Sequence, residues 1–242
     1  MFEPPFVAAD RYEAQLAALG HAVISTTSVQ RCFGAAKTDL TALATHWNDL
    51  PADAYLKDGG HYRFRRHSCF VADGGQLRQA PHRAHWQPLD YNALHGGIER
   101  MFEPLAPATA ANPAWTSLML GLSGVASRLK GERPWFIEAH QFRIDTASGI
   151  GRPTPEGAHR DGVDLVAVFL VARHAIKGGE SRVFDAQGPS GQRFTLREPW
   201  TLLLLDDERV IHETTPIQPE GAAPGHRDTL VVTLRSGGFQ GP

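Results

Sequence analysis

Three side chains in this sequence carry groups that could bind one metal ion together. His159 and Asp161 stand two residues apart, and His212 follows much later in the chain. Two imidazoles and one carboxylate can occupy one face of an octahedral ion, which leaves up to three coordination positions open. Open positions admit reactants, whereas a structural metal is closed by protein ligands on every side. The pattern therefore predicts chemistry at a metal.

The surroundings of this motif distinguish it from a chance pair. A second His-x-Asp at residues 226–228 has no histidine after it, so it cannot complete the same order. The first pair precedes an apolar run at residues 163–171, which is typical of a buried strand. Because alternate residues of an extended segment point the same way, His159 and Asp161 can approach one ion together. These ligand types suit zinc and manganese as well as iron.

Further motifs follow in a definite order. They are the run Pro-Glu-Gly-Ala-His-Arg-Asp-Gly at 155–162, Gly-Gly-Glu-Ser at 178–181, the segment 207–212 that ends in His212, and the segment 227–233 that begins with Arg227. Together they resemble the Fe(II)/2-oxoglutarate-dependent dioxygenases. In the residues of these motifs they resemble the bacterial branch that contains L-isoleucine dioxygenase. Some members of that branch are named biofilm stress and motility proteins. The matching motifs span residues 136–236, with a looser likeness at 47–51 and 62–66.

The resemblance assigns roles to particular residues. It implies that His159, Asp161 and His212 bind Fe(II), and that Arg227 binds the distal carboxylate of the co-substrate 2-oxoglutarate with help from Thr229. The planar guanidinium suits this role because it can meet a carboxylate at two points. Arg235, eight residues further along the same predicted strand, shares a face with Arg227 and is the alternative anchor.

Composition fits a soluble enzyme. The length of 242 residues suits one domain over residues 1–242, and the two cysteines do not suggest a disulfide framework. The start of the chain lacks the features of a signal peptide, and no apolar run approaches the ~18 residues that span a bilayer. We therefore expect a cytoplasmic protein with no membrane partner. A net charge of −2 with dispersed signs argues against nucleic-acid binding, and homo-oligomerisation stays open.

The predicted fold is mainly β with N-terminal helices. Residues 1–134 are expected to be largely helical, with helices at 11–19 capped by Asp10, at 40–47, and from Pro113 to Gly131. From residue 135 to 236 the pattern changes to short apolar runs, which predict strands at 135–144, 163–171, 181–185, 193–196, 201–205, 210–217 and 229–234. Such a series indicates an antiparallel sandwich or barrel. The resemblance sharpens this to a double-stranded β-helix, the cupin-like jelly roll.

Two short pairs are predicted to be turns. Gly178-Gly179 can form a tight turn between strands because glycine accepts positive φ. Asp206-Asp207 is also predicted to be a turn, with hydrogen bonding to a metal-ligating histidine as the alternative.

The resemblance further implies a free aliphatic L-amino acid as substrate, of the isoleucine, leucine or methionine type. A pocket for such a molecule needs a cation, an anion or carbonyl, and an apolar wall. Arg65, in the basic stretch 61–67, and Arg143 are candidate cations, Gln141 shares the strand face of Arg143, and Glu138 is a candidate anion. The candidate wall residues are Phe64, Phe142 and Trp200.

Three alternatives remain at this level. One is a hydroxylase of another small molecule or of a peptide. Another is a metal-dependent isomerase or hydrolase on the same kind of barrel, which Arg227 argues against because such an enzyme does not bind 2-oxoglutarate. The third is a protein that senses metal or 2-oxoglutarate without turnover, and the sequence is compatible with it.

Overall fold

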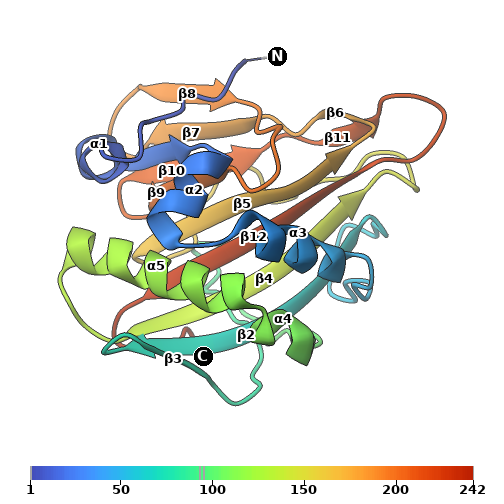
Figure 1. Ribbon diagram of the computed structural model, residues 1–242. Coiled ribbons are helices and arrows are strands. Elements are labelled where there is room, and N and C mark those ends of the chain that lie inside the picture. Colours follow the sequence, from blue (N-terminus) through green and yellow to red (C-terminus); the bar gives the residue numbers. More distant parts are fainter. Residues whose placement is uncertain (1, 93, 95, 242) are drawn as a thin grey trace.

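Three antiparallel sheets and a layer of helices make up the described part of the protein (Figure 1). The computed structural model describes residues 2–92, 94 and 96–241. A large seven-stranded sheet carries the helices on one face and packs its other face against a three-stranded sheet. This is the jelly-roll arrangement that the sequence analysis predicts, with N-terminal helices beside it.

The helices cover the outer face of the large sheet. They are α1 (Tyr12–Leu19), α2 (Thr26–Phe33), α3 (Lys37–Ala44), the 3₁₀ helix η1 (Thr45–Trp47), α4 (Pro107–Ala111) and α5 (Pro113–Lys130). Asn112 caps α5 as predicted, because its side chain accepts the N–H of Ala114. The prediction that Asp10 caps α1 is wrong, since Arg11 occupies the cap position. In the described part of the chain, no helix has both the length and the apolarity needed to cross a membrane.

The large sheet has the order β1-β9-β5-β12-β4-β2-β3. Its strands are β1 (His21–Ile24), β2 (Arg63–Asp73), β3 (Gln76–Gln79), β4 (Trp135–Asp145), β5 (Leu165–His174), β9 (Leu202–Asp206) and β12 (His226–Arg235). Three of these strands come from the N-terminal part, which the sequence pattern indicates as largely helical. That part therefore builds the sheet as well as covering it.

The smaller sheets close the other side. The three-stranded sheet has the order β10-β7-β8, and β11 pairs with β6. Their bounds are β6 (Ile176–Gly178), β7 (Ser181–Asp185), β8 (Gly191–Phe194), β10 (Val210–Thr214) and β11 (Ile217–Pro219). The single strand predicted at 210–217 is thus two strands. The break falls at Pro216, which has no N–H to donate to a ladder.

The two faces of β12 have different tasks. Leu230, Val232 and Leu234 pack into the apolar core beneath the helices. The alternate residues Thr229 and Val231, and others of the same parity, face the space between the sheets, because successive side chains of a strand point to opposite faces. The register pairs Thr229 with Phe142 of β4, and this places the cavity-facing residues of both strands side by side.

Candidate metal centre and its cavity

A short backbone bridge brings His159 beside His212. The N–H of His159 donates to the carbonyl of His212 at 3.0 Å, and the N–H of His212 donates back at 2.9 Å. These two bonds attach the loop that follows β4 to strand β10. The imidazole rings then lie on the same side, with their centroids 4.6 Å apart.

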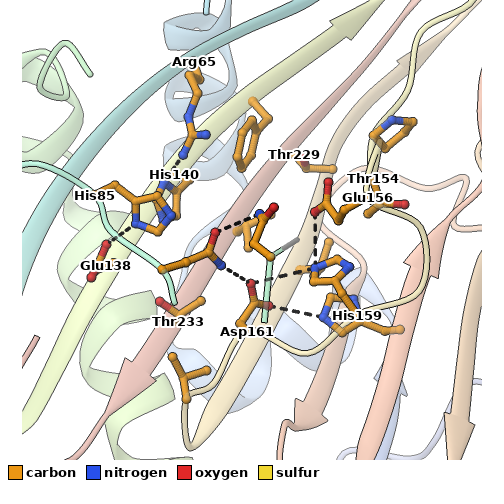
Figure 2. Close-up of a pocket in the computed structure, with 18 of the residues that line it drawn as sticks. Arg65, His85, Glu138, His140, Thr154, Glu156, His159, Asp161, Thr229 and Thr233 are labelled. Atoms are coloured by element: carbon orange, nitrogen blue, oxygen red, sulfur yellow. Dashed lines mark hydrogen bonds and ion pairs between the residues drawn. The ribbon is translucent and has the colours of Figure 1, made fainter. Parts of the chain in front are cut away.

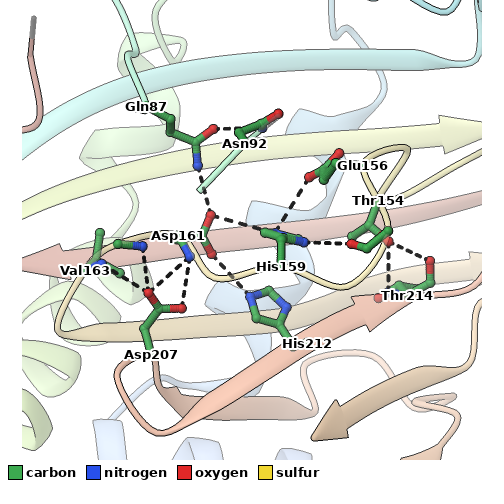
Figure 3. A network of polar contacts seen from close by, with 12 residues as sticks. Gln87, Asn92, Thr154, Glu156, His159, Asp161, Val163, Asp207, His212 and Thr214 are labelled. Carbon is green, nitrogen blue, oxygen red and sulfur yellow. Dashed lines mark hydrogen bonds and ion pairs between the residues drawn. The ribbon is translucent and has the colours of Figure 1, made fainter. Parts of the chain in front are cut away.

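Asp161 completes a compact group of three possible metal ligands (Figure 3). One ligand atom from each of His159, Asp161 and His212 lies within 4.8 Å of the other two. Oδ2 of Asp161 is 3.3 Å from Nε2 of His212, and its Oδ1 is 3.9 Å from Nε2 of His159. Nδ1 of His159 faces the carbonyl of Gly157 at 3.0 Å, which leaves Nε2 free to bind a metal. The donor set fits a six-coordinate divalent ion with open positions.

Asp207 fixes the backbone of the Asp161 segment. Its buried carboxylate accepts the N–H groups of Asp161 at 3.0 Å, Gly162 at 2.7 Å and Val163 at 3.1 Å (Figure 3). Burial, together with the charge of Asp161, raises the pKa of Asp207. Asp207 lies in a turn, as predicted, while Asp206 ends strand β9. The Asp207 carboxylate also binds the backbone beside a candidate ligand, whereas the alternative considered from the sequence was a histidine side chain.

Gln87 contacts the carboxylate of Asp161 directly. Its Nε2 donates to Oδ1 of Asp161 at 3.1 Å. Its Oε1 accepts from Asn92 at 3.1 Å and from Nη2 of Arg100 at 2.9 Å. Two donors on Oε1 fix the orientation of the amide, so Nε2 must face Asp161. The sequence analysis missed Gln87, because a glutamine in an irregular loop carries no spacing signal.

The metal-facing groups open into a cavity between the sheets (Figure 2). Arg65, Glu138 and His140 from β2 and β4 line one side, and His159 and Asp161 line the other. The apolar part of the wall comes from Phe136, Phe142, Ile144, Val168 and Val231. The cavity thus combines charged groups of both signs with an apolar surface, as small-molecule sites commonly do.

Arg227 and Arg235 both line this cavity, but their surroundings differ. Arg227 is 3% exposed, and its Nη2 has no hydrogen-bond partner among the described residues. Burial and the nearby Arg173 lower the pKa of Arg227 to about 10. Arg235 is less buried and donates to the carbonyl of Gly238. A buried guanidinium with an unused donor fits an anion such as a carboxylate, and Thr229 lies two residues away on the same face.

The predicted substrate residues divide between the two faces of the sheet. Arg65 lines the cavity. Arg143 lies on the opposite face, where it forms an ion pair with Asp228 at 2.7 Å, and Gln141 is fully buried on that same face. The prediction that Arg143 and Gln141 face the cavity is wrong. On β4 the even-numbered residues, such as Glu138 and Phe142, point inward, so the odd-numbered ones point away.

The predicted wall residues also divide. Phe142 lines the cavity. Phe64 pairs in register with Arg143 and shares its outward face. Trp200 packs against Trp47, at 6.2 Å between ring centroids, within the core beneath the helices.

A second group of possible metal ligands lies in the cavity wall. It consists of His67, His85, Glu138 and His140, all buried. His67 and His85 contact the same oxygen of Glu138 at 2.9 and 2.6 Å, and burial lowers the pKa of His67 to about 4. These neutral imidazoles therefore donate to a carboxylate.

Arg65 argues against a metal ion in this second group. Its guanidinium donates to Nδ1 of His140 at 2.7 Å, so a permanent cation already stands beside the cluster. A divalent ion there would be repelled by that charge. We therefore interpret the cluster as a hydrogen-bonded wall of the cavity.

Comparisons with known proteins agree with this geometry. The sequence model of the 2OG-Fe dioxygenase family matches residues 44–233. The structure of a bsmA homologue from Methylobium petroleophilum PM1 is 50% identical, covers 99% of this chain and 98% of its own, and superposes with a TM-score of 0.93. L-isoleucine-4-hydroxylase from Bacillus thuringiensis is 24% identical over 202 residues, which are 81% of this chain and 82% of that protein.

A more distant structure shows the same fold. IDO from Bacillus thuringiensis superposes with a TM-score of 0.77 at 18% identity, over 98% of this chain and 100% of that one. The matched residues 44–233 include the three candidate metal ligands and Arg227. The resemblance and the jelly-roll fold predicted from the sequence are thereby confirmed. The chain belongs to the 2OG-Fe dioxygenase family, whose members use Fe(II) and 2-oxoglutarate.

Proposed function

We propose that this dioxygenase hydroxylates an aliphatic C–H bond of a free L-amino acid, with Fe(II) held by His159, Asp161 and His212. The observation that supports it best is the compact group of two imidazoles and a carboxylate at the edge of a partly apolar cavity. Bound Fe(II) supplies, with 2-oxoglutarate and oxygen, the oxidising power for such a bond. The protein positions the substrate and 2-oxoglutarate relative to the metal.

The residues around the metal have separate tasks in this proposal. Gln87 occupies Oδ1 of Asp161 and leaves Oδ2 for the metal. Arg227 pairs with the far carboxylate of 2-oxoglutarate through its unused buried donor, and the Thr229 hydroxyl adds a hydrogen bond. Phe142 and Val231 give the aliphatic chain of the substrate an apolar surface.

The amino-acid substrate is supported by two independent points. The relative from Bacillus thuringiensis is named for hydroxylation of L-isoleucine. The cavity of this chain offers cations and carboxylates beside its apolar wall, which suits a small molecule with two charges and one apolar chain. Arg65 lines that cavity and stays a predicted substrate-binding residue.

We expect several free aliphatic amino acids to be converted at different rates. An apolar wall distinguishes single methylenes by only about 1–3 kcal/mol, so absolute selection of one amino acid is not expected. The measurement is succinate formation together with a product heavier by one oxygen, for isoleucine, leucine and methionine and for their N-acetyl and amide forms. Equal turnover of the blocked forms would contradict recognition of the charged groups. Failure of every free amino acid, with iron and 2-oxoglutarate bound, would favour another substrate or a sensor.

Replacing Gln87 tests the positioning of Asp161. We expect Gln87→Met to weaken Fe(II) binding by roughly 10–100-fold, the usual effect of removing a hydrogen-bond partner of a metal ligand. The measurement is anaerobic competition with a chelator. Gln240→Met is the matched control, because Nε2 of Gln240 donates to the carbonyls of Asp161 and Gly162 and leaves the carboxylate alone. Equal losses of Fe(II) affinity in the two variants would show that both glutamines act by holding the segment of Asp161 and Gly162 in place, and that orientation of the Asp161 carboxylate by Gln87 adds nothing.

A further inference from the structure

Three buried arginines meet at one corner of the cavity. Arg63, Arg65 and Arg100 are 6%, 3% and 2% exposed, and all three line the cavity. Asp53 is within ion-pair distance of two of them, with Oδ2 at 2.7 Å from Nε of Arg63 and 3.8 Å from Nη1 of Arg65. Within the described residues, Arg100 forms no ion pair, and its Nη2 donates to the neutral amide of Gln87.

Each of these arginines keeps an unused donor. Among the residues that the structure describes, Nη2 of Arg63, Nε of Arg65 and Nε of Arg100 are buried without a hydrogen-bond partner. Buried N–H groups are almost always paired in folded proteins, and an unpaired buried charge is costly. Three unpaired donors on arginines that line one cavity therefore indicate an anionic ligand.

Carboxylates oppose the three guanidiniums at this corner. Asp53, Glu156 and Glu138 all act on the charge of Arg100, and Asp53 and Glu138 also act on Arg65. A ligand cation paired with Glu156 would leave one guanidinium charge for a ligand carboxylate. Burial and the neighbouring Arg63 lower the pKa of Arg100 to about 10, so Arg100 is still charged at neutral pH and can bind that carboxylate.

A negatively charged group lies close to this corner. Glu156 lines the same cavity, and its Oε2 is buried without a partner in the described part of the chain. Its Oε1 is 3.6 Å from Nε2 of His159 (Figure 2), and the negative charge of Glu156 opposes the lowering of the pKa of Arg100. A cation site and an anion site, each with unused hydrogen-bonding capacity, are therefore neighbours.

We propose that Arg100, with Arg63 and Arg65, binds the α-carboxylate of an amino acid and that Glu156 binds its α-ammonium. The proposal rests on the proposed function for the class of molecule, while the unused donors and the unused acceptor assign each charged group to a residue. Arg65 is held rigidly, since its guanidinium lies 3.7 Å from the ring centre of Phe102 and 4.3 Å from that of Phe142. Arg63 and Arg100 each keep one further unpaired donor for the carboxylate. The proposed carboxylate site is separate from Arg227.

Three ligands distinguish the contribution of the α-carboxylate to binding from that of the α-ammonium. They are L-leucine, L-leucinamide, which lacks the carboxylate, and 4-methylpentanoate, which lacks the ammonium. Each is titrated calorimetrically into protein loaded anaerobically with Fe(II) and 2-oxoglutarate. We expect wild-type protein to bind leucine most tightly and leucinamide least tightly.

Two variants should then show opposite patterns. Arg100→Met should weaken leucine binding by roughly thirty to several thousand fold, the range for loss of one partner of a buried charge pair, and leave leucinamide binding unchanged. Glu156→Gln should weaken leucine binding and leave 4-methylpentanoate binding unchanged. Arg66→Met is the matched control, because Arg66 lies on the other face of β2 and donates to the carbonyl of Pro104. Where Arg100→Met does not fold, Arg100→Lys and Glu156→Gln carry the test.

Each contrary outcome has a definite meaning. If Arg100→Met weakened 2-oxoglutarate binding instead of leucine binding, the arginine corner would be the co-substrate site. If Glu156→Gln weakened Fe(II) binding instead, Glu156 would belong to the metal centre. Equal losses for all three ligands in either variant would also overturn the assignment. Selective losses without any leucine hydroxylation would support the binding site and contradict the proposed reaction, so the two failures are distinguishable.

Discussion

His212→Ala protein is expected to lose Fe(II) affinity by more than about a hundredfold while it remains folded. Removing a hydrogen-bond partner of a metal ligand usually weakens metal binding by about 10–100-fold. A larger loss is expected here, because the substitution removes one of the three proposed ligands itself. His212 contributes its side chain to the metal group and its backbone to the bridge with His159. An alanine keeps the backbone bridge, so the loss reports on the imidazole alone.

The same experiment has a matched control and a pH dependence. His226→Ala removes the histidine of the second His-x-Asp pair, which lies beside Asp228 and away from the cavity, and should leave Fe(II) binding unchanged. Burial opposes protonation of His159, but the charges of Asp161 and Glu156 outweigh it and raise its pKa. Imidazole binds metal only when neutral, so affinity should be full above that raised pKa and fall as pH drops through it. Unchanged stoichiometry and affinity in His212→Ala would remove this residue from the site.

Arg227→Met is expected to raise the 2-oxoglutarate concentration needed for half-saturation by roughly thirty to several thousand fold. This range corresponds to the loss of one partner of a buried charge pair, about 2–5 kcal/mol. Arg227 is almost fully buried and keeps an unused donor, so little water can replace the guanidinium. Fe(II) binding should stay nearly intact, because Arg227 is not a member of the metal group.

Arg235→Met provides the decisive comparison for Arg227. Both arginines line the cavity from the same face of β12, but Arg235 is less buried and already donates to Gly238. We expect its replacement to change 2-oxoglutarate binding far less. If Arg235→Met produced the large effect and Arg227→Met did not, the anchor of the co-substrate would be Arg235.

Local patterns in the sequence predict most of the C-terminal strands and the cap of α5. The run at 181–185 and the strand that begins at residue 135 are recovered almost to the residue, because alternation and apolar runs depend on near neighbours. Strand β2 is harder to predict, because its arginines and histidines read as a solvated edge. In the folded protein this strand is flanked by β3 and β4, and its Arg63 and Arg65 are buried against the cavity, while Arg66 lies on the other face.

Three-dimensional contacts account for what the sequence could not provide. Spacing could place His159 and Asp161 on one side of a segment, but the orientation of β4 relative to the cavity depends on packing against the helices. For that reason Gln141 and Arg143 were assigned to the wrong face. Gln87 and Asp207 reach the Asp161 segment from distant loops, and no local pattern encodes such contacts.

The two faces of β12 also bear on how such an enzyme could diversify. Leu230, Val232 and Leu234 hold the helices in place, while Thr229 and Val231 line the cavity. Substitutions at the cavity positions could change which molecule fits without disturbing the apolar contacts on the other face. A one-residue insertion or deletion within the strand would instead exchange the two faces, burying threonines under the helices and exposing leucines in the cavity. Evolution along this strand is therefore expected to proceed by point substitution, because insertions and deletions would exchange its two faces.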